Sequence, residues 1–173
     1  MTSVRQEIKQ SRPFASSADE AVVALLRRAD QLRGTLTLVV EPAGITLQQY
    51  NVLRILRGAG EGGLPTLEIA ARMIEHSPGI TRLLDRLETK GLVARHHCRD
   101  DRRRVLCRNT ERALRLLASV DSPLSQATAH ALGALDARDQ AGLVRLLDAI
   151  RPAIPSSRTV TRMKPVKTKE KRE

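Results

Sequence analysis

The sequence predicts an α+β fold that is mostly helical, with long helices around one small pair of antiparallel strands. The chain of 173 residues has one Phe, one Tyr and no Trp. Its core must therefore be built from Leu, Ile, Val and Ala, which favours packed helices over a sandwich or a barrel. Apolar residues recur with a period of about 3.6 along several segments. Only residues 92–108 read as two short strands, joined by a charged tip.

The charge of the chain indicates a polyanionic partner. The formal net charge is +11 and the isoelectric point is about 10.9, a balance that attracts nucleic acid or an anionic membrane. No apolar run approaches the ~20 residues that a membrane-spanning helix needs, and residues 1–17 lack the apolar segment of a signal peptide. We therefore expect nucleic acid rather than a membrane as the partner, and a cytoplasmic location.

The first long helix is expected to follow a loose arm. Residues 1–16 are polar and contain Pro13, so we expect them to form a flexible N-terminal arm. Ser17 and Glu20 fit a capping box at the start of the helix, and Pro42 and Gly44 end it. The apolar stripe of this helix consists of Val22, Leu25, Leu26, Ala29, Leu32, Leu36 and Val39.

Two shorter helices are predicted next. Thr46 and Gln49 form a second capping box, and the helix that it opens has as inward residues Leu47, Tyr50, Leu53 and Leu56. A glycine-rich loop over residues 58–63 follows. Thr66 then caps a short helix that runs through residue 74, whose inner face is expected to consist of Leu67, Ala70, Met73 and Ile74.

The clearest helix of the sequence precedes the strands. Ser77 is a good N-cap and Pro78 suits the first helical position, while Gly91 supplies a left-handed cap at the end. The positions i, i+3, i+4 and i+7 of this helix are all apolar, and they are Ile80, Leu83, Leu84 and Leu87. With the short helix before it, this segment fits a helix-turn-helix, in which the second helix reads the major groove of DNA.

Two more helices and a tail complete the chain. Thr110 caps a helix that continues past a kink at Pro123, with inward residues Leu114, Leu117 and Val120. Asp136 caps a final helix, which closes at Pro152. Residues 151–173 form a basic tail that we expect to be disordered, because residues 156–173 hold seven Lys or Arg, two Glu and almost nothing to bury.

This order of elements, together with three motifs, resembles the MarR family of winged helix-turn-helix transcriptional regulators. The motifs are residues 44–53, 77–95 and 101–106. The resemblance implies a winged helix domain at residues 17–150, with a DNA-binding lobe at about 46–109 and dimerisation helices at about 17–40 and 110–150. The chain departs from the family at Asn109, where leucine is usual, and at Ala113 and Leu114, where a glycine often stands.

A homodimer is expected because the outer helices carry apolar stripes broader than one small winged domain can bury. Two copies would place two recognition helices about one DNA turn, ~34 Å, apart on a pseudo-palindromic site. The resemblance further implies regulation of transcription, with repression favoured. It also implies an effector, either an unknown small molecule or an oxidant, which shifts the spacing of the two lobes from a pocket between the dimerisation helices and the DNA-binding lobe.

The polar face of the recognition helix is expected to supply the major-groove contacts. Gly79 would let the backbone come close to the DNA. Arg82 can grip a guanine through two hydrogen bonds, worth ~1–3 kcal/mol of discrimination, and Arg86, one turn later, is better placed for a phosphate. The full set expected in the major groove is Ser77, Pro78, Gly79, Thr81, Arg82 and Arg86.

The strand pair reads as a basic wing. Residues 95–108 hold six arginines and two aspartates, a local net charge of +4. By resemblance, Arg103 enters the minor groove and Asp101 orients the tip, and narrow A·T-rich minor grooves do attract arginine. The other wing arginines are expected to contact phosphates, which give affinity and salt dependence rather than sequence preference; they are Arg95, Arg99, Arg102, Arg104 and Arg108.

Three other interpretations stay open. A DNA-coating protein would use the charge without sequence preference. A thiol-based redox sensor would use Cys98 and Cys107, which lie near arginines that lower a thiol pKa, although two small hydrophobic residues fit the same positions. RNA binding is disfavoured because the chain has few aromatics to stack bases. No metal is expected, since His76, His96 and His97 lack further converging ligands, and neither a cofactor nor an enzyme activity is indicated.

Overall fold

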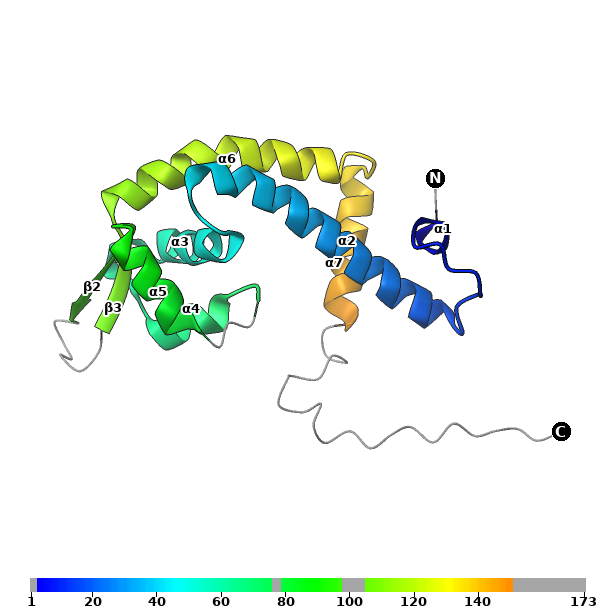
Figure 1. The fold of residues 1–173 in the computed structure, drawn as a ribbon, viewed down its shortest axis with the longest axis horizontal. Helices are drawn as coiled ribbons and strands as arrows, with labels where there is room; N and C mark the ends of the chain where they lie inside the picture. Colours follow the sequence, from blue (N-terminus) through cyan, green and yellow to red (C-terminus); the bar gives the residue numbers. More distant parts are fainter. Residues whose placement is uncertain (1–2, 76–78, 98–104, 151–173) are drawn as a thin grey trace, which may run out of the picture. The chain divides into compact units, whose positions relative to one another are not determined.

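Figure 1 shows the computed structural model of the chain, which describes residues 3–75, 79–97 and 105–150. The chain divides into two compact units, residues 1–131 and 132–173. The predicted α+β, mostly helical fold is confirmed. No described helix is long and apolar enough to cross a membrane. The elements, in chain order, are α1 (Val4–Glu7), α2 (Ser17–Val40), η1 (Glu41–Ala43), α3 (Leu47–Ala59), η2 (Gly60–Gly62), β1 (Leu64–Pro65), α4 (Thr66–Arg72), α5 (Ile80–Thr89), β2 (Val93–His97), β3 (Val105–Asn109), α6 (Glu111–Ala131) and α7 (Ala137–Ile150).

The long helix α2 begins and ends close to where the sequence predicts. Its cap is Ser16 rather than Ser17, because the Ser16 hydroxyl accepts a hydrogen bond from the backbone N–H of Asp19 at 3.1 Å. Ser16 and Ser17 are adjacent in the sequence, and the prediction assigned the capping box to Ser17. At its C-terminal end α2 gives way to η1, and Gly44 follows with a φ of 75°, as predicted.

Helix α6 lies beside α2 in the first unit (Figure 1). Its predicted cap is confirmed, since the Thr110 hydroxyl accepts a hydrogen bond from the Ala113 N–H at 3.2 Å, and the helix runs on through Pro123. The inward prediction for Leu114 was wrong: 39% of Leu114 is exposed, whereas Ala113 is fully buried. Neighbouring residues of a helix point in directions that differ by about 100°. Because Ala113 faces the core, Leu114 points away from it.

Helix α3 begins with the predicted capping box. The Gln49 N–H donates to the Thr46 hydroxyl and the Thr46 N–H donates to the Gln49 side chain, each at 3.2 Å. The four side chains predicted to face inward all belong to the core or pack against it. Local capping and the apolar stripe were therefore sufficient to predict this helix.

Helix α4 is shorter than predicted and turns a different face inward. Thr66 is its first helical residue and does not cap it. Ile69 is fully buried, whereas Leu67 and Ile74 are 82% and 77% exposed. Met73 has an extended backbone, with φ −64° and ψ 140°. The helical period therefore stops before residues 73 and 74. The predicted inner face was wrong for Leu67 and Ile74, whereas Ala70 and Met73 pack against the core as predicted.

The sheet has the order β1-β3-β2, with both pairs antiparallel. Strands β2 and β3 are the predicted wing strands. Strand β1 was not predicted, because two residues, one of them Pro65, show no alternating pattern. Gly63 precedes β1 with a φ of 66°, and a Cβ there would lie 2.5 Å from the carbonyl oxygen of Cys107. Only glycine fits this position without a shift of the backbone.

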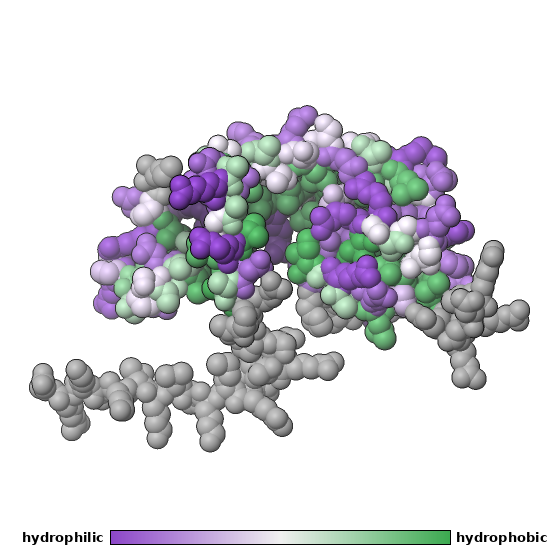
Figure 2. Space-filling view, turned by 180° about the vertical axis from the view of Figure 1, so that it is seen from behind, coloured by the Kyte–Doolittle hydropathy of each residue, from purple (hydrophilic) through white to green (hydrophobic). Residues whose placement is uncertain are grey.

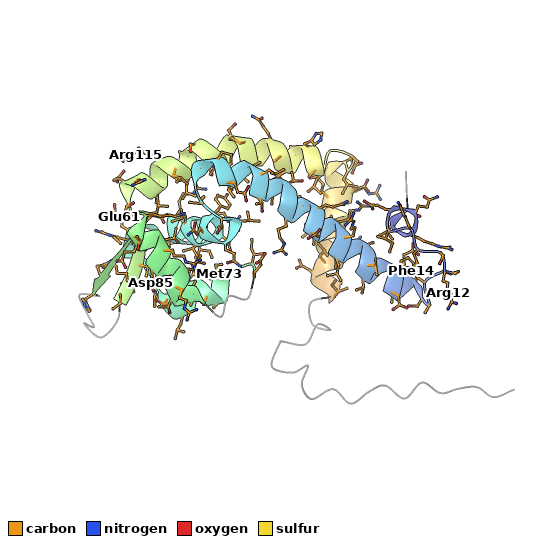
Figure 3. The ribbon with its side chains drawn as sticks, in the orientation of Figure 1. Arg12, Phe14, Glu61, Met73, Asp85 and Arg115 are labelled. Carbon is orange, nitrogen blue, oxygen red and sulfur yellow. The ribbon has the colours of Figure 1, made fainter. Side chains whose placement is uncertain are left out.

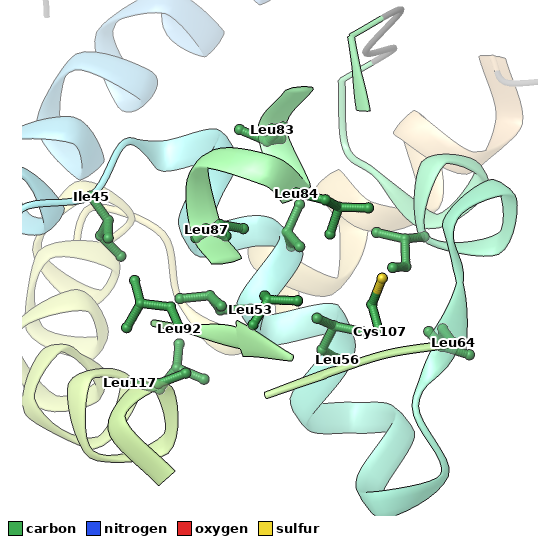
Figure 4. Close-up of a cluster of buried hydrophobic side chains, with 14 of the residues drawn as sticks. Ile45, Leu53, Leu56, Leu64, Leu83, Leu84, Leu87, Leu92, Cys107 and Leu117 are labelled. Carbon is green, nitrogen blue, oxygen red and sulfur yellow. The ribbon is translucent and has the colours of Figure 1, made fainter. Parts of the chain in front are cut away.

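One aliphatic core fills the space between α3, α5 and the sheet (Figure 4). Its most deeply buried members include Leu53, Leu84 and Leu87, all with no exposed surface. Tyr50 packs against this cluster. The buried members are Val40, Ile45, Val52, Leu53, Leu56, Leu64, Ile69, Ile80, Leu83, Leu84, Leu87, Leu92, Val93, Cys107, Ala113, Leu117, Val120 and Leu124.

A short helix, α1, stands in the segment predicted to be a loose arm. Val4 is 8% exposed, and the Glu7 carboxylate accepts hydrogen bonds from Arg28 at 2.6 Å and Gln31 at 2.8 Å. The bond from Arg28 is the main reason why the pKa of Glu7 is lowered. The prediction was wrong for residues 4–7, because the partners of Glu7 lie more than 20 residues along the chain and leave no local pattern.

Helix α7 belongs to the second unit. Its predicted cap is confirmed, since the Asp136 carboxylate accepts a hydrogen bond from the Asp139 N–H at 2.8 Å. None of its residues is buried. The basic tail, residues 151–173, lies outside the described residues.

Replacing Gly63 by alanine is expected to lower the free energy of unfolding by about 2 kcal/mol, because the new Cβ meets a backbone oxygen at a positive φ. Urea unfolding followed by circular dichroism measures the change. Gly62→Ala is the matched control, since a Cβ at Gly62 would meet no atom within 4 Å. Equal stability of the two variants would contradict the close fit at Gly63.

Candidate nucleic-acid interface

Helix α5 separates an apolar face from a polar face, as predicted. Leu84 and Leu87 are fully buried, whereas Thr81, Arg82 and Arg86 on the opposite face are exposed. The core holds the apolar face in place, so the polar face is presented to solvent in a fixed orientation.

The start of α5 differs from the prediction. The first helical residue is Ile80 rather than Pro78, and the N-cap is Gly79 rather than Ser77. Gly79 has a φ of −105° and a ψ of 29°, which are not helical, and none of the described side chains caps the first turn. Ser77 and Pro78 themselves lie outside the described residues.

The end of α5 is fastened in two ways. Gly91 has a φ of 67° and forms the predicted left-handed cap, and the Leu92 N–H donates to the Leu87 carbonyl at 2.9 Å. The Lys90 ammonium donates to the Gly44 carbonyl at 2.6 Å and to a side chain of the α3 capping box at 3.1 Å. The C-terminal end of α5 is therefore tied to the segment that joins α2 to α3.

The segment before α5 is braced from α2 and α3. The Asn51 side-chain oxygen, in a residue only 5% exposed, accepts a hydrogen bond from the Ile74 N–H at 2.9 Å. Glu75 accepts a hydrogen bond from Gln48 at 3.1 Å and forms an ion pair with Arg33. The approach to the recognition helix is thus held by one buried amide and one ion pair.

Arg82 and Arg86 stand free on the polar face of α5. Neither makes an ion pair with any residue of 3–75, 79–97 or 105–150. They are four positions apart, at the spacing i, i+4, so they project from the same side of the helix. Gly79 is also exposed, and a Cβ there would meet nothing within 4 Å. The free protein therefore places no packing demand on glycine at this position.

Arg95, on strand β2, is not free. Its Nη1 donates to the Glu88 carboxylate at 2.8 Å and its Nη2 donates to the Asp85 carboxylate at 2.6 Å. The hydrogen bond to Asp85 is the main reason why the pKa of Arg95 is raised. Figure 3 marks Asp85 on α5. Both terminal nitrogens of Arg95 are therefore engaged by the recognition helix in the free protein, and its phosphate contact stays a prediction.

The wing has its two strands in place. Arg108 on β3 lies opposite Ala94 on β2 and is exposed, so its phosphate contact stays a prediction. Six other residues predicted to act in the wing lie outside the described residues, and they are Cys98, Arg99, Asp101, Arg102, Arg103 and Arg104.

Among the described residues there is neither a reactive thiol nor a cluster of metal ligands. Cys107 is fully buried, and this burial raises the pKa of its thiol, while a hydrogen bond with Arg95 lowers it to a smaller extent. The expectation that neighbouring arginines lower this pKa was wrong, because loss of hydration outweighs them. Within the described ranges, no three His, Cys, Asp or Glu side chains group as metal ligands.

Several open cavities border this lobe, two of which adjoin the wing strands or Arg86. The larger, of about 570 Å³, lies between α3, the wing strands and the start of α6, and Arg57 and Arg108 are among its lining residues. A second, of about 260 Å³, lies between α2, the start of α3 and α5, and its lining includes Arg33, Glu75 and Arg86.

Comparison with known proteins shows the family. The model of the MarR family matches residues 45–105. The crystal structure of a MarR transcription factor from Planctomyces limnophilus has 36% sequence identity to this chain and a TM-score of 0.60, over 79% of this chain and 99% of that one. The chain belongs to the MarR family. It is a DNA-binding transcription regulator with a winged helix fold, as predicted.

Two further solved structures are similar. CouR from Rhodococcus jostii RHA1, bound to p-coumaroyl-CoA, has 25% identity and a TM-score of 0.69 over 83% of this chain and 98% of that one. A MarR family regulator from Streptomyces coelicolor, in complex with DNA, has 22% identity and a TM-score of 0.71 over 86% and 96%. The second likeness concerns the fold alone.

The departure of this MarR-family chain at Asn109 has a structural consequence. The Asn109 amide donates to the Leu53 carbonyl at 2.9 Å, so the end of β3 is bonded to α3. The next residue, Thr110, donates its hydroxyl to the Gly91 carbonyl at 2.8 Å. Wing, α3 and the end of α5 are therefore joined by hydrogen bonds just before α6 begins.

Sequence reasoning missed the contacts that hold the recognition helix of this MarR-family protein. Asp85 and Glu88 are spaced i, i+3, and the following strand carries Arg95. This pattern indicates that two acids and a base lie near one another, but it does not reveal which partner each one takes. The bond from Lys90 to Gly44 joins residues 46 positions apart, and no local pattern indicates it.

Burial of Cys107 predicts slow thiol chemistry. In a Cys98→Ser variant, the remaining thiol is expected to react with a thiol reagent at pH 8 about a hundredfold more slowly in the native protein than in urea. The raised pKa disfavours the thiolate, which is the reactive form, and burial excludes the reagent. Rapid reaction of the folded protein would contradict the burial of Cys107 and would support the redox-sensor interpretation.

Proposed function

We propose that this MarR-family chain binds duplex DNA as a homodimer, reads a pseudo-palindromic operator, and represses transcription until a small-molecule effector releases it. The observation that carries the proposal is α5 itself, a helix braced at both ends that presents the unpaired Arg82 and Arg86. A net charge of +11 adds general attraction to the phosphate backbone. A cytoplasmic location goes with this proposal.

The base contacts are proposed to come from the first half of α5. Arg82 is assigned to a guanine, since a guanidinium can donate two hydrogen bonds to the O6 and N7 atoms of that base. Arg86, one turn further, is assigned to a phosphate. The remaining members of the proposed major-groove set are Ser77, Pro78, Gly79 and Thr81.

The wing is proposed to brace the protein in the adjacent minor groove. The antiparallel strands β2 and β3 supply a ribbon, and Arg103, oriented by Asp101, is assigned to the minor groove at its tip. Four arginines are assigned to phosphates, namely Arg99, Arg102, Arg104 and Arg108.

Dimerisation is supported by apolar side chains that the single chain leaves exposed. On α2, Val22, Leu25 and Leu26 are 56%, 40% and 64% exposed, at the spacing i, i+3, i+4 of one helix face. Figure 2 shows hydrophobic side chains at the surface among hydrophilic ones. The exposed apolar residues of α7 are Leu143, Val144, Leu146, Leu147 and Ile150. Burial of apolar surface stabilises association by about 25 cal/mol per Å², and we propose a second copy as the partner.

Release by a small molecule is supported by the cavity of about 260 Å³ beside α5 and by the p-coumaroyl-CoA bound to the similar protein CouR. A ligand can shift the DNA-binding arrangement only if it has a higher affinity for one arrangement than for the other. The burial of Cys107 favours a small molecule over an oxidant as the effector.

The second candidate function is non-specific DNA coating, which the high positive charge favours. Coating relies on phosphate contacts, which carry no sequence information. The two functions therefore differ in one observable, the enrichment of a sequence from a random pool.

Selection from a random duplex pool at about physiological salt is expected to enrich a pseudo-palindrome with half-sites about one helical turn apart. Arg82→Ala should relax the preference at one base pair in each half-site, equivalent to ~1–3 kcal/mol. Arg86→Ala is the matched control and should weaken binding to all sequences alike. Retention of DNA without enrichment would favour the coating protein, and a uniform loss in Arg82→Ala would make Arg82 a phosphate contact.

Arg103→Ala is expected to weaken binding most on operators with A·T-rich flanks, because narrow minor grooves attract arginine most strongly. Fluorescence anisotropy on operators that differ only in their flanks measures the difference. Arg104→Ala serves as the control, with an equal loss expected on both flanks. If Arg103→Ala binds operators with A·T-rich flanks as tightly as the wild-type protein does, the assignment of Arg103 to the minor groove is wrong.

A further inference from the structure

The recognition helix carries two acidic residues that a DNA-binding surface does not need. Asp85 and Glu88 lie on the non-core side of α5, and 52% and 42% of their side chains are exposed. Asp85 stands directly before Arg86, one of the two unpaired cations. Carboxylates at this position would repel a phosphate backbone that approaches the helix.

A single residue from the wing engages both acids. The two terminal nitrogens of Arg95 reach different carboxylates, Glu88 at 2.8 Å and Asp85 at 2.6 Å. The planar guanidinium suits this task, since its donors point in fixed directions. An ammonium on the same strand would offer a single point charge instead.

The position of Arg95 is fixed from the opposite strand. Arg95 and Cys107 are directly paired across β2 and β3, so the side chain of Arg95 lies on the same face of the sheet as the fully buried Cys107. The arginine is therefore held between the core side of the wing and the outer side of α5. Only 27% of its side chain is exposed.

We propose that Arg95 is a positioning residue for DNA binding: it neutralises Asp85 and Glu88 and joins the wing to α5, so that the recognition helix meets DNA without opposing charge. The inference rests on the proposed DNA-binding function. It separates Arg95 from the other wing arginines, whose assigned partners are phosphates. It also explains why the wing and the recognition helix are linked by charge at the surface, where ion pairs contribute little to folding.

The test compares the loss of Arg95 in two backgrounds. Arg95→Gln is made in the wild-type chain and in an Asp85→Asn/Glu88→Gln chain, and affinity for a duplex selected by the wild-type protein is measured at several salt concentrations. In the wild-type background we expect an affinity about tenfold lower, because two carboxylates lose their partner. In the neutral background we expect a change of less than about twofold, because no charge is left to neutralise.

The alternative roles of Arg95 predict a different result. A phosphate contact or a purely structural role would give the same loss in both backgrounds, and a phosphate contact would also lower the salt dependence by about one unit. Either result would overturn the proposal. Arg115→Gln, on α6 (Figure 3), is the matched control for the loss of one positive charge, and it should leave the affinity within about twofold of wild type.

Two further measurements separate failure of the inference from other failures. If Arg95→Gln lowers the melting temperature by more than about 5 °C, Arg95→Lys is compared in the same two backgrounds under the same criterion, a greater loss in the wild-type background than in the neutral one. Wild-type protein that selects no duplex would overturn the proposed function itself. Wild-type binding with equal losses in both backgrounds would overturn only the role assigned to Arg95.

Discussion

Burial of the apolar face of α5 is the constraint on which the rest of the interface depends. Leu84 and Leu87 have no exposed surface, and they pack in the same cluster as Leu53 of α3. Each fully buried leucine contributes about 1.5–3 kcal/mol relative to an exposed one, so α5 has one preferred rotation about its axis. That rotation fixes which residues face outward, and the positions of Arg82 and Arg86 follow from the packing of leucines that never touch DNA.

Around α5, acidic side chains are paired with arginines, whereas Arg82 and Arg86 form no ion pair within the described residues. Within the described ranges, three acids on α5 or just before it are engaged by arginines: Glu75 by Arg33, and both Asp85 and Glu88 by Arg95. These pairs are partly exposed, so each adds little to stability. Their effect is on the field at the surface. With the acids neutralised in pairs, the cations that stay unpaired on the outer face of α5 determine the sign of the potential that DNA meets.

Sequence reasoning predicted an element correctly wherever the interaction that determines it is local. The caps at Thr46 and Asp136 lie within three residues of the groups that they bind, and the apolar spacing of α5 lies within one segment. The features that sequence reasoning missed depend on contacts between residues far apart in the sequence, such as those of Glu7 with residues of α2. Cys107 is an intermediate case: the strand was predicted, but its register decides which side faces the core, and so the direction of the pKa shift.

The two ends of α5 are held by different kinds of contact. At the C-terminal end, the Gly91 cap and the bond from the Thr110 N–H to the Leu92 carbonyl are made by backbone groups next to the start of α6. At the N-terminal end no side chain in the described part of the chain caps the helix, and part of the brace is the partly exposed Arg33–Glu75 pair. Backbone caps resist rearrangement more than exposed ion pairs do. A movement of α2 would therefore be felt first at the N-terminal end of α5, which is the half assigned to reading bases.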